Sequence, residues 1–488
     1  MRLSNATLSK LPPEVLRPNY DREKLTAGIV HIGLGNFHRA HQAWYLHRLM
    51  QKGLALDWAI IGAGVRPYDA VMRDCLIAQD CLTTLIELDP VSSSAEVIGG
   101  MIDYLPIEDG NASLIRRMAQ KDIRIVSITV TEGGYFIDPA TNRFDASSPE
   151  IIYDAANPKE PKTAFGAIVA ALRLRRDNGL GPFTGLCCDN LQGNGDIFRQ
   201  VIVSLARMSE PGLANWIDAN CTFPNSMVDC IVPTTGSNEI ALAKETGIED
   251  PVPVTHENFR QWVVEDDFCA GRPDWDKVGV QCIERVHDFE LMKLRILNGG
   301  HQVVSVPAEV LSLKTIASSM QHPLISRLFQ KVALTEIAPN VKAVPGMTPE
   351  DYVNLIYNRF ANPKIIDTTR RVAFDGSSRH PCFVVPPIRD GLAVGTPVEG
   401  LALVEAAWAR MCEGERENLT IIEPNDPLWN ELQAKAREAR KTPSVWLEMR
   451  QIYGDLSDEP RFADSFVFWL EMIWSKGLEK TISTYLDG

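Results

Sequence analysis

The sequence predicts an α/β fold in which a parallel sheet, covered by helices on both faces, is followed by a mostly α-helical domain. Short apolar runs rich in β-branched residues alternate with helical segments up to about residue 285, which is the pattern of a parallel sheet. The periodicity then changes to long helical segments with few strand-like runs. We therefore expect two domains, residues 1–285 and 286–488, although residues 275–286 fit either half.

The size and composition of the chain limit its class. It has 488 residues, of which 45% are hydrophobic, and this is too much for a single ordinary core. A net charge of −14 disfavours nucleic acid and anionic membranes as partners. The ten cysteines form no CxxC pair and no zinc-type Cys/His spacing, which indicates reduced thiols of a cytoplasmic protein. The N-terminal segment lacks an apolar signal core, and no run approaches the roughly 18 apolar residues of a membrane span.

Strands and helices can be placed from the periodicity of apolar residues. Strands that are buried on both faces are typically continuous apolar runs. Such runs predict strands at residues 28–32, 57–61, 123–130 and 183–188, with a helix at residues 38–52 after the first of them. In the second domain, helical spacing of apolar residues predicts helices at residues 289–304, 324–337, 349–360, 398–412, 428–440 and 462–485.

A glycine-rich turn, GLGNFHR at residues 33–39, follows the first predicted strand and precedes a helix. In a Rossmann-type domain with a doubly wound sheet, the first glycine allows a tight turn and the second lets the backbone approach a pyrophosphate. His38 occupies the position of the third glycine, so the motif alone is weak. Its strand–turn–helix context still predicts a dinucleotide site with cofactor contacts from Gly33, Gly35, Asn36, Phe37 and Arg39. Arg39 would contact phosphate, or else lie on the helix surface.

The end of the second strand is where a dinucleotide-binding domain distinguishes NAD from NADP. An acidic residue there accepts a hydrogen bond from a ribose 2′-hydroxyl, whereas an arginine pairs with a 2′-phosphate. Both occur here, as Arg66 and Asp69, and Asp69 lies later than the usual spacing. We expect Asp69 to contact the cofactor and NAD to be preferred over NADP. The alternative is that Asp69 caps the following helix.

Polar residues also follow the later strands. Thr131 and Glu132 come after the third predicted strand, and Asn190 comes after the fourth. Because ligands bind beyond the carboxyl ends of parallel strands, we expect Thr131 and Glu132 to line the cofactor and Asn190 to polarise a carbonyl. Asp229 ends another short segment, FPNSMVD. Each of these residues can equally be an ordinary loop residue.

One predicted helix, residues 289–304, carries an unusual set of polar side chains: Glu290, Lys293, Asn298 and His301. At about 100° per residue they fall within an arc of roughly 140°, and the axial distance from Lys293 to His301 is about 12 Å. They can meet one small molecule only if the lysine reaches along the axis, or if Asn298-Gly299-Gly300 loosens the helix. The alternative interpretation is a solvated lysine, a polar asparagine at a glycine break and a histidine of the core.

Two segments of the helical domain, DTTRR at residues 367–371 and DGSSR at residues 375–379, are further candidates. An arginine donates a planar fork of hydrogen bonds, which suits a polyol or keto-sugar. Arg371 and Arg379 are therefore candidate substrate contacts. Ordinary ion pairing on a helix surface is the simpler explanation for Arg370.

Together these motifs resemble the mannitol dehydrogenase family, the long-chain, metal-independent polyol dehydrogenases. The matching segments are GIVHIGLGNFHRAHQ, VTEGGY, CDNLQGNG, FPNSMVD, FELMKLRILNGGH and DTTRRVAFDGSSR, which span most of the chain in the order of the family. The resemblance implies a Rossmann-type N-terminal domain, a mostly α-helical C-terminal domain and an active site between them. Two positions depart from the family pattern: Cys230 stands where arginine is usual, and Arg379 where lysine is more frequent.

The resemblance also implies a role for each candidate residue. Lys293 corresponds to the catalytic general base, and His301 to the histidine that orients the substrate. Asn190 and Asn298 correspond to the pair that stabilises an oxyanion. Glu290 would pass the proton to solvent, or would be an ordinary paired glutamate. The substrate contacts implied by the family are Asp229, Arg371 and Arg379.

The implied activity is reversible, NAD-dependent oxidation of an open-chain polyol, with D-mannitol and D-fructose as the implied pair. The expected partners are therefore small-molecule polyols and ketoses. No metal is expected, because the amide donors would take the place of a Lewis acid. A lysine amine has a pKa of about 10.4 in water, so a base near neutrality needs a dry site or neighbouring cations. Arabinitol or sorbitol oxidation and reduction of a fructuronate-like hexuronate are alternatives within the family, and a non-catalytic dinucleotide-binding regulator is the alternative outside it.

Overall fold

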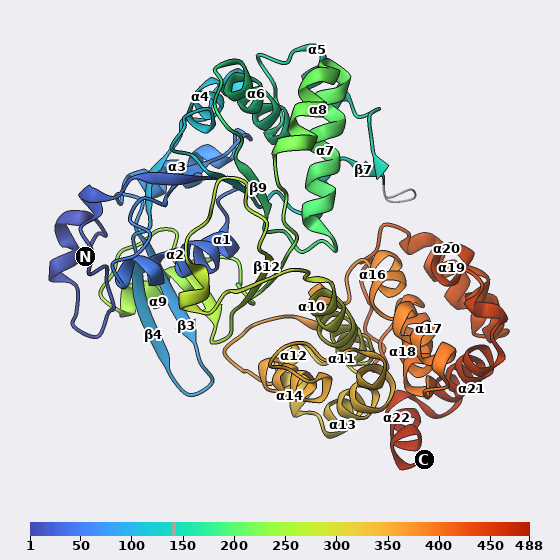
Figure 1. The fold of residues 1–488 in the computed structure, drawn as a ribbon. Helices are drawn as coiled ribbons and strands as arrows, with labels where there is room; N and C mark the ends of the chain where they lie inside the picture. Colours follow the sequence, from blue (N-terminus) through green and yellow to red (C-terminus); the bar gives the residue numbers. More distant parts are fainter. Residues whose placement is uncertain (139–142) are drawn as a thin grey trace. The chain divides into compact units, whose positions relative to one another are not determined.

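The computed structural model describes residues 1–138 and 143–488, which form two compact units, Met1–His287 and Asp288–Gly488. All strands of the described chain belong to the first unit, and the second unit is helical (Figure 1). Strand β13 (Gln281–Ile283) pairs with β12 (Gln261–Glu265). The segment at residues 275–286, which fitted either half on sequence grounds, therefore belongs to the first unit.

A five-stranded sheet forms the centre of the first unit, in the order β5-β2-β1-β6-β9. Every neighbouring pair in it is parallel. Its strands are β1 (Ala27–Ile32), β2 (Ala59–Ala63), β5 (Met101–Tyr104), β6 (Ile125–Ile128) and β9 (Thr184–Cys187). This arrangement confirms the predicted α/β fold with a Rossmann-type sheet, although β2 continues two residues further than the sequence indicated.

The central strand β1 is buried along its whole length because helices cover both faces of the sheet. Val30 and Ile32 pack in one apolar cluster with α6 (Ala164–Asp177). Ile29 packs in a second cluster with α2 (Gln42–Gln51). Apolar residues on both faces are the reason that the strand appears in the sequence as a continuous apolar run.

The helix predicted at residues 38–52 is interrupted at His41. The structure has two helices there, α1 (Asn36–Ala40) and α2, and His41 between them has non-helical backbone angles of φ −121° and ψ −94°. The buried ring of His41 reaches the carbonyl oxygen of Gln261 in β12 at 3.0 Å and packs against Trp262. The prediction of one continuous helix was wrong because the partner of His41, Gln261, is distant in the sequence.

Smaller elements complete the first unit. Two three-stranded sheets, β11-β3-β4 and β10-β12-β13, and a two-stranded sheet, β7-β8, were not predicted. Their strands are β3 (Thr83–Leu88), β4 (Ser93–Ile98), β7 (Ile137–Asp138), β8 (Arg143–Phe144), β10 (Ser226–Asp229) and β11 (Val254–Glu257). The remaining α-helices are α3 (Asp69–Ile77), α4 (Ala112–Met118), α5 (Pro149–Ala156), α7 (Asn194–Ser209), α8 (Pro211–Asn220) and α9 (Ser237–Glu245).

The second unit is built around α18 (Glu399–Cys412), which is buried from Gly400 to its end and packs against α11 and α21. A helix that is apolar on all sides is stable only when neighbours surround it. The other helices are α10 (His287–Met292), α11 (Gly299–Val310), α12 (Ile316–Gln321), α13 (Pro323–Val332), α14 (Pro349–Phe360), α15 (Thr369–Val372), α16 (Gly376–Phe383), α17 (Val385–Val394), α19 (Trp429–Ala439), α20 (Arg450–Tyr453), α21 (Pro460–Lys476) and α22 (Leu478–Asp487). Within the described ranges, no helix combines the length and the apolar character that crossing a bilayer requires.

Two of the predicted helices contain π-helical turns. Residues Lys293–Asn298 form a π-helix between α10 and α11, and residues Ala333–Ile337 form another at the end of α13. A π-helical turn holds an extra residue and frequently occurs at functional sites. The helix predicted at residues 289–304 is therefore present, but it runs from His287 to Val310 and is irregular at its centre.

Candidate active site

The glycine turn after β1 has the geometry that its two glycines predict. Gly33 has a φ of +92°, and a Cβ atom there would lie 2.0 Å from the carbonyl oxygen of Thr129, so only glycine fits. Gly35 is exposed, and a Cβ atom added to it would meet no atom within 4 Å. Gly33 therefore makes the turn, and Gly35 leaves its backbone accessible at the start of α1.

Arg39 is a buried support for this turn. Its side chain is 1% exposed. Its guanidinium donates to the backbone oxygens of Gly35 (3.3 Å) and Val252 and to Oδ1 of Asn36 (2.7 Å). Burial lowers the pKa of Arg39 to about 10, so the group is still a cation near neutral pH. The helix-surface alternative is wrong, and these three hydrogen bonds use three of the five N–H groups of the guanidinium.

The two residues that begin α1 are also held in place. The amide of Asn36 donates to the carbonyl oxygen of Pro233 and to Oγ1 of Thr235, both at 2.9 Å. The ring of Phe37 is stacked on that of His41, with 4.8 Å between centroids. Both residues are partly exposed, so they line the turn without closing it.

His38, at the position of the third glycine, packs against the strand through its ring. The rings of His38 and His31 are stacked with 3.4 Å between centroids. Burial lowers the pKa of His31 to about 3 and the pKa of His38 well below its usual value, so both rings are neutral. The hydroxyls of Ser127 and Thr129 lie 2.8 and 3.0 Å from the ring nitrogens of His31. At this position a glycine would let the helix pack closely on the strand. Here the helix instead packs on the strand through the two stacked, uncharged histidine rings.

Asp69 lies at the start of α3 and folds back over the loop that follows β2. Its Oδ2 accepts hydrogen bonds from the backbone N–H groups of Val65 (3.0 Å) and Arg66 (2.9 Å). A Cβ atom at Gly64 would lie 2.5 Å from the same oxygen. Asp69 is the first residue of α3, whose N-cap is Tyr68, so the capping alternative is wrong. Its carboxylate instead shapes the loop at the end of β2.

Thr131 follows β6 in a conformation that is costly for a β-branched residue, with φ 67° and ψ 159°. The carboxylate of Asp189, beyond β9, accepts hydrogen bonds from the N–H groups of Val130 (2.9 Å) and Thr131 (3.1 Å). Glu132 begins a short 3₁₀ turn, but its side chain lies outside the described part of the structure. One carboxylate therefore joins the turn after β6 to the turn after β9.

Asn190 is exposed at the end of β9. The buried Asn194 donates from Nδ2 to the carbonyl oxygens of Asp189 (3.0 Å) and Ser226 (2.9 Å), which ties this turn to β10. Asp229, the last residue of β10, is 5% exposed. Asp189 and Asn194 were not among the predicted site residues, and their only signal was the segment that contains Asn190.

Predicted cofactor and catalytic residues of the first unit lie at one edge of the sheet. Gly33, Asp69, Thr131 and Asn190 follow β1, β2, β6 and β9, which are neighbours in the parallel sheet. Because the carboxyl ends of parallel strands lie at the same edge, these residues share the position at which such sheets bind ligands. The first unit thus offers backbone, amide and carboxylate groups at one edge.

In the second unit, the polar set lies along α10, the π-helical turn and α11. Glu290 and Lys293 are buried, with 6% and 8% exposed, whereas Asn298 and His301 are partly exposed. The rotation between Lys293 and Asn298 differs from the α-helical value assumed from the sequence, because a π-helical turn holds more residues. The irregularity lies at this turn and not at the following glycines, which are α-helical.

His301 is packed against an aromatic ring and is neutral. Its imidazole is stacked on Phe360 with 4.2 Å between centroids. Burial is the main cause that lowers the pKa of His301 to about 4; the carboxylate of Asp367 opposes this effect, and the cations Arg371, Arg359 and Arg379 reinforce it. A neutral imidazole can donate one hydrogen bond and accept another.

Arg371 and Arg379 are oriented by neighbouring groups. Arg371 donates from Nε and Nη2 to the two carboxylate oxygens of Asp367, at 2.7 and 2.6 Å. The Arg371 side chain is 65% exposed and that of Asp367 only 7%, so a buried carboxylate orients an accessible guanidinium. Arg379 donates from Nη1 to the carbonyl oxygen of Val372 at 2.6 Å. Asp367 is a residue that the sequence did not single out as part of the site.

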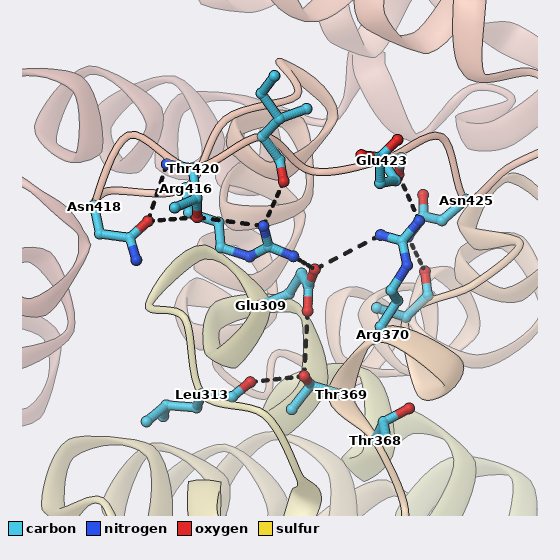
Figure 2. Close-up of polar contacts among 12 residues, drawn as sticks. Glu309, Leu313, Thr368, Thr369, Arg370, Arg416, Asn418, Thr420, Glu423 and Asn425 are labelled. Carbon is cyan, nitrogen blue, oxygen red and sulfur yellow. Dashed lines mark hydrogen bonds and ion pairs between the residues drawn. The ribbon is translucent and has the colours of Figure 1, made fainter.

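Arg370, next to Arg371, belongs to a structural network around Glu309 (Figure 2). The buried Glu309 lies in α11, and its Oε1 is 2.5 Å from Nη2 of Arg416 and 3.9 Å from Nη1 of Arg370. Its Oε2 accepts a hydrogen bond from Thr369 at 3.2 Å. Arg370 also donates to the backbone oxygens of Glu423 and Pro424. The network fixes α15, and with it the backbone of Arg371.

The two units therefore offer different chemical groups. The second unit presents a buried amine, an amide, a neutral imidazole and two oriented arginines. The first unit presents an accessible glycine turn and polar residues at the carboxyl edge of a parallel sheet. Among residues 1–138 and 143–488, no group of three or more His, Cys, Asp or Glu side chains is arranged to hold a metal ion.

Comparison with known proteins places both units in one family. Residues 27–277 match the mannitol dehydrogenase Rossmann domain, and residues 285–474 match the mannitol dehydrogenase C-terminal domain. A mannitol 2-dehydrogenase of Cereibacter sphaeroides is 52% identical over 97% of this chain and 99% of its own length. One from Aspergillus clavatus is 41% identical over 96% of this chain and 95% of its own length.

Solved structures agree with this comparison. The ternary complex of Pseudomonas fluorescens mannitol 2-dehydrogenase with NAD and D-mannitol is 39% identical, with a TM-score of 0.87 over 100% of both chains. A substrate-free D-sorbitol dehydrogenase is 33% identical, with a TM-score of 0.92 over 99% of this chain and 100% of its own. With both domains matched and relatives this similar along nearly the whole length, the chain is a member of the mannitol dehydrogenase family.

Proposed function

We propose that this protein is an NAD-dependent mannitol 2-dehydrogenase, which interconverts D-mannitol and D-fructose. The observation that carries the proposal is the buried Lys293 in a π-helical turn, with Glu290 before it and Asn298 and His301 after it. Support comes from relatives of that name and from the neighbour that binds NAD and D-mannitol. In the reaction, mannitol and NAD⁺ give fructose, NADH and one proton.

Lys293 is the proposed general base. Its uncharged amine takes the proton of the C2 hydroxyl while the hydrogen on the same carbon leaves as hydride for the nicotinamide. Burial disfavours a charged amine, so the 8% exposure of Lys293 favours the base form. Glu290, buried one turn earlier, is the proposed acceptor that passes the proton from Lys293 to solvent.

Amide groups are the proposed stabilisers of the alkoxide that develops on the substrate. We propose that Asn190 and Asn298 both donate to this oxygen, and that neutral His301 orients the same hydroxyl. Asp229 and Arg379 are proposed contacts for the other hydroxyls of the chain. Arg371 is a further proposed contact, since its guanidinium is accessible while Asp367 holds it.

The glycine turn and the loops after β2 and β6 are the proposed cofactor site. Gly33, Gly35, Asn36 and Phe37 would face the pyrophosphate, with Arg39 as their support. Thr131 and Glu132 would line the nicotinamide side. Asp69 would accept from the ribose 2′-hydroxyl through the carboxylate whose Oδ2 also holds the loop.

Replacing Asp69 with asparagine should lower the preference for NAD over NADP by about tenfold. The amide keeps an oxygen for the N–H groups of Val65 and Arg66 but removes the negative charge that would repel a 2′-phosphate. The measurement is kcat/KM with each cofactor. Glu150→Gln is the control, because Glu150 pairs with Arg66 at 3.6 Å without touching Asp69. An unchanged cofactor ratio in Asp69→Asn would contradict the assignment.

The proposed mechanism needs no metal ion, since an amine base and amide donors supply proton transfer and charge stabilisation. Incubation with EDTA followed by gel filtration is therefore expected to leave the turnover of mannitol unchanged within experimental error. Loss of activity that zinc restores would overturn the metal-free mechanism. The control is the melting temperature before and after treatment, which separates loss of a structural ion from loss of a catalytic one.

Steady-state kinetics with a panel of substrates test the function as a whole. Mannitol, sorbitol, arabinitol and a hexuronate are compared, each with NAD and NADP, and mannitol with NAD is expected to have the highest kcat/KM. Sorbitol oxidation is the second candidate, because the sorbitol dehydrogenase structure has a TM-score of 0.92. Tight NADH binding without turnover of any substrate would favour a non-catalytic regulator instead.

A further inference from the structure

We infer that Asp189 is a positioning residue that holds the turn carrying Thr131 and the turn carrying Asn190 in one fixed arrangement. The inference rests on the proposed function, because these two turns supply the proposed nicotinamide contacts and one alkoxide donor. Asp189 itself is 9% exposed and touches neither reactant in this proposal. It acts through the backbone that it binds.

The carboxylate of Asp189 is bound to the turn after β6 by both of its oxygens. Oδ2 accepts from the N–H of Val130 at 2.9 Å, and Oδ1 accepts from the N–H of Thr131 at 3.1 Å. The hydroxyl of Tyr135 donates to Oδ2 at 2.5 Å. A buried carboxylate with several charge-assisted hydrogen bonds fixes its partners more strongly than a neutral acceptor does.

Thr131 shows why this fixation is needed. With φ 67° and ψ 159°, its backbone lies in a region that β-branched residues avoid, and such a conformation persists only when the surroundings impose it. Phe136, five residues later, is also left-handed, with φ 53°. A Cβ atom at Gly133 would meet no atom within 4 Å, so side-chain packing does not hold the middle of the turn. The carbonyl oxygen of Thr131 accepts from the N–H of Gly134 at 3.0 Å, and its N–H donates to Asp189, the contact that joins Thr131 to another strand end.

Tyr135 and Cys187 form a hydrogen-bonded pair that holds the carboxylate of Asp189. The phenol of Tyr135 is 1% exposed, and burial raises its pKa well above the usual value, so it stays protonated and donates. Its oxygen lies 2.8 Å from Sγ of Cys187. Because the only proton of the phenol goes to Asp189, the thiol of Cys187 is the donor in that second contact. The thiol of Cys187 therefore donates to the phenol of Tyr135, and the phenol donates to the carboxylate of Asp189.

The backbone of Asp189 fixes the turn after β9 at the same time. Its carbonyl oxygen accepts from Nδ2 of Asn194 and from the N–H of Leu191, both at 3.0 Å. Asn190 lies between Asp189 and Leu191 in the chain, so these contacts hold the backbone from which its exposed side chain extends. The backbone position of one proposed alkoxide donor is therefore coupled to the conformation of Thr131.

The first test is Asp189→Asn, measured by fluorescence titration with NADH and by steady-state kinetics. An amide keeps the shape but replaces one acceptor oxygen with a donor, so one of the two backbone N–H groups loses its partner. The dissociation constant for NADH and the KM for NAD are expected to rise about tenfold, and kcat to fall several-fold. Tyr135→Phe, which removes a single hydrogen bond to the carboxylate, is expected to raise the dissociation constant about threefold.

Asp154→Asn is the matched control for a purely structural effect. Asp154 is another buried carboxylate of the first unit, and it accepts from the N–H groups of Lys162 and Thr163 and from the hydroxyl of Thr163. Its loss is expected to lower the melting temperature and to leave NADH binding unchanged. Equal effects of the Asp154 and Asp189 variants on NADH binding would overturn the inference.

Rescue by glycine gives a readout that a merely structural role would not move. Thr131→Gly removes the cost of the left-handed backbone, so Asp189→Asn should raise the dissociation constant for NADH less in the Thr131→Gly background than in the wild type. An equal effect of Asp189→Asn in both backgrounds, or wild-type affinity in both Asp189→Asn and Tyr135→Phe, would overturn the inference. If Asp189→Asn does not fold, the dissociation constant of Tyr135→Phe for NADH tests the inference alone. Absence of NADH binding and polyol turnover in the wild type would instead refute the proposed function.

Discussion

Replacing Lys293 with alanine is expected to lower kcat for mannitol oxidation by about 100- to 10,000-fold, the range that a positioned general base contributes. The dissociation constant for NADH should stay nearly unchanged, since all proposed cofactor contacts belong to the first unit and Lys293 to the second. Rapid mixing with mannitol and NAD measures the chemical step directly. Added primary amines should restore part of the rate by replacing the missing base.

The control for this experiment is Arg295→Ala. Arg295 lies in the same π-helical turn and is also a basic side chain, but its Nε donates to Oδ2 of Asp390 at 2.9 Å within the second unit. Its loss should reduce kcat by less than tenfold if charge in this turn is not the cause. Wild-type turnover by Lys293→Ala, or an equal loss in both variants, would remove the assignment of Lys293 as the base.

The central sheet could be predicted from the sequence because each of its strands has a recognisable apolar run within a few residues. A strand covered on both faces is buried at every position, as β1, β2, β6 and β9 are, and its residues are therefore mostly apolar. The small sheets were missed because polar residues interrupt the apolar runs of their strands, which pair with distant partners. Strand β4, for example, begins with two exposed serines.

The break in the first helix shows a limit of the same reasoning. Nothing between residues 36 and 51 demands a break, and the cause is the contact of His41 with Gln261, which is 220 residues away in the chain. The burial of Arg39 could not be predicted for a related reason. Its acceptors include Val252, so the sequence near Arg39 could not reveal that the guanidinium is buried.

Candidate residues for the site could be named from the sequence, but the residues that hold them in place could not. Strand ends and a polar helix face identified Asn190, Lys293 and His301, because short motifs carry these side chains. The residues that hold them, such as Asp189 and Asp367, act through hydrogen bonds with backbone or side chains whose geometry appears only in the folded unit. The π-helical turn is likewise a property of packing, since its residues are ordinary helix formers.

Replacing either Asn190 or Asn298 with alanine should lower kcat by about 100- to 1,000-fold, because loss of one oxyanion donor costs about 3–4 kcal/mol in the transition state. Asn190 is exposed and Asn298 partly exposed, so neither change creates a buried cavity and the melting temperature should stay close to that of the wild type. The isosteric Asn298→Asp, which replaces the donor with a negative charge facing the alkoxide, should lose at least as much.

The double variant distinguishes a shared target from two separate ones. If both amides donate to the same oxygen, each single change already removes part of the other's effect, and the combined loss in kcat should be smaller than the product of the two single losses. A strictly multiplicative loss would indicate that the amides act on different atoms. A wild-type kcat in Asn190→Ala would remove that residue from the mechanism. Asp189→Asn would then be expected to affect only NADH binding, since Asn190 is the route by which Asp189 influences kcat.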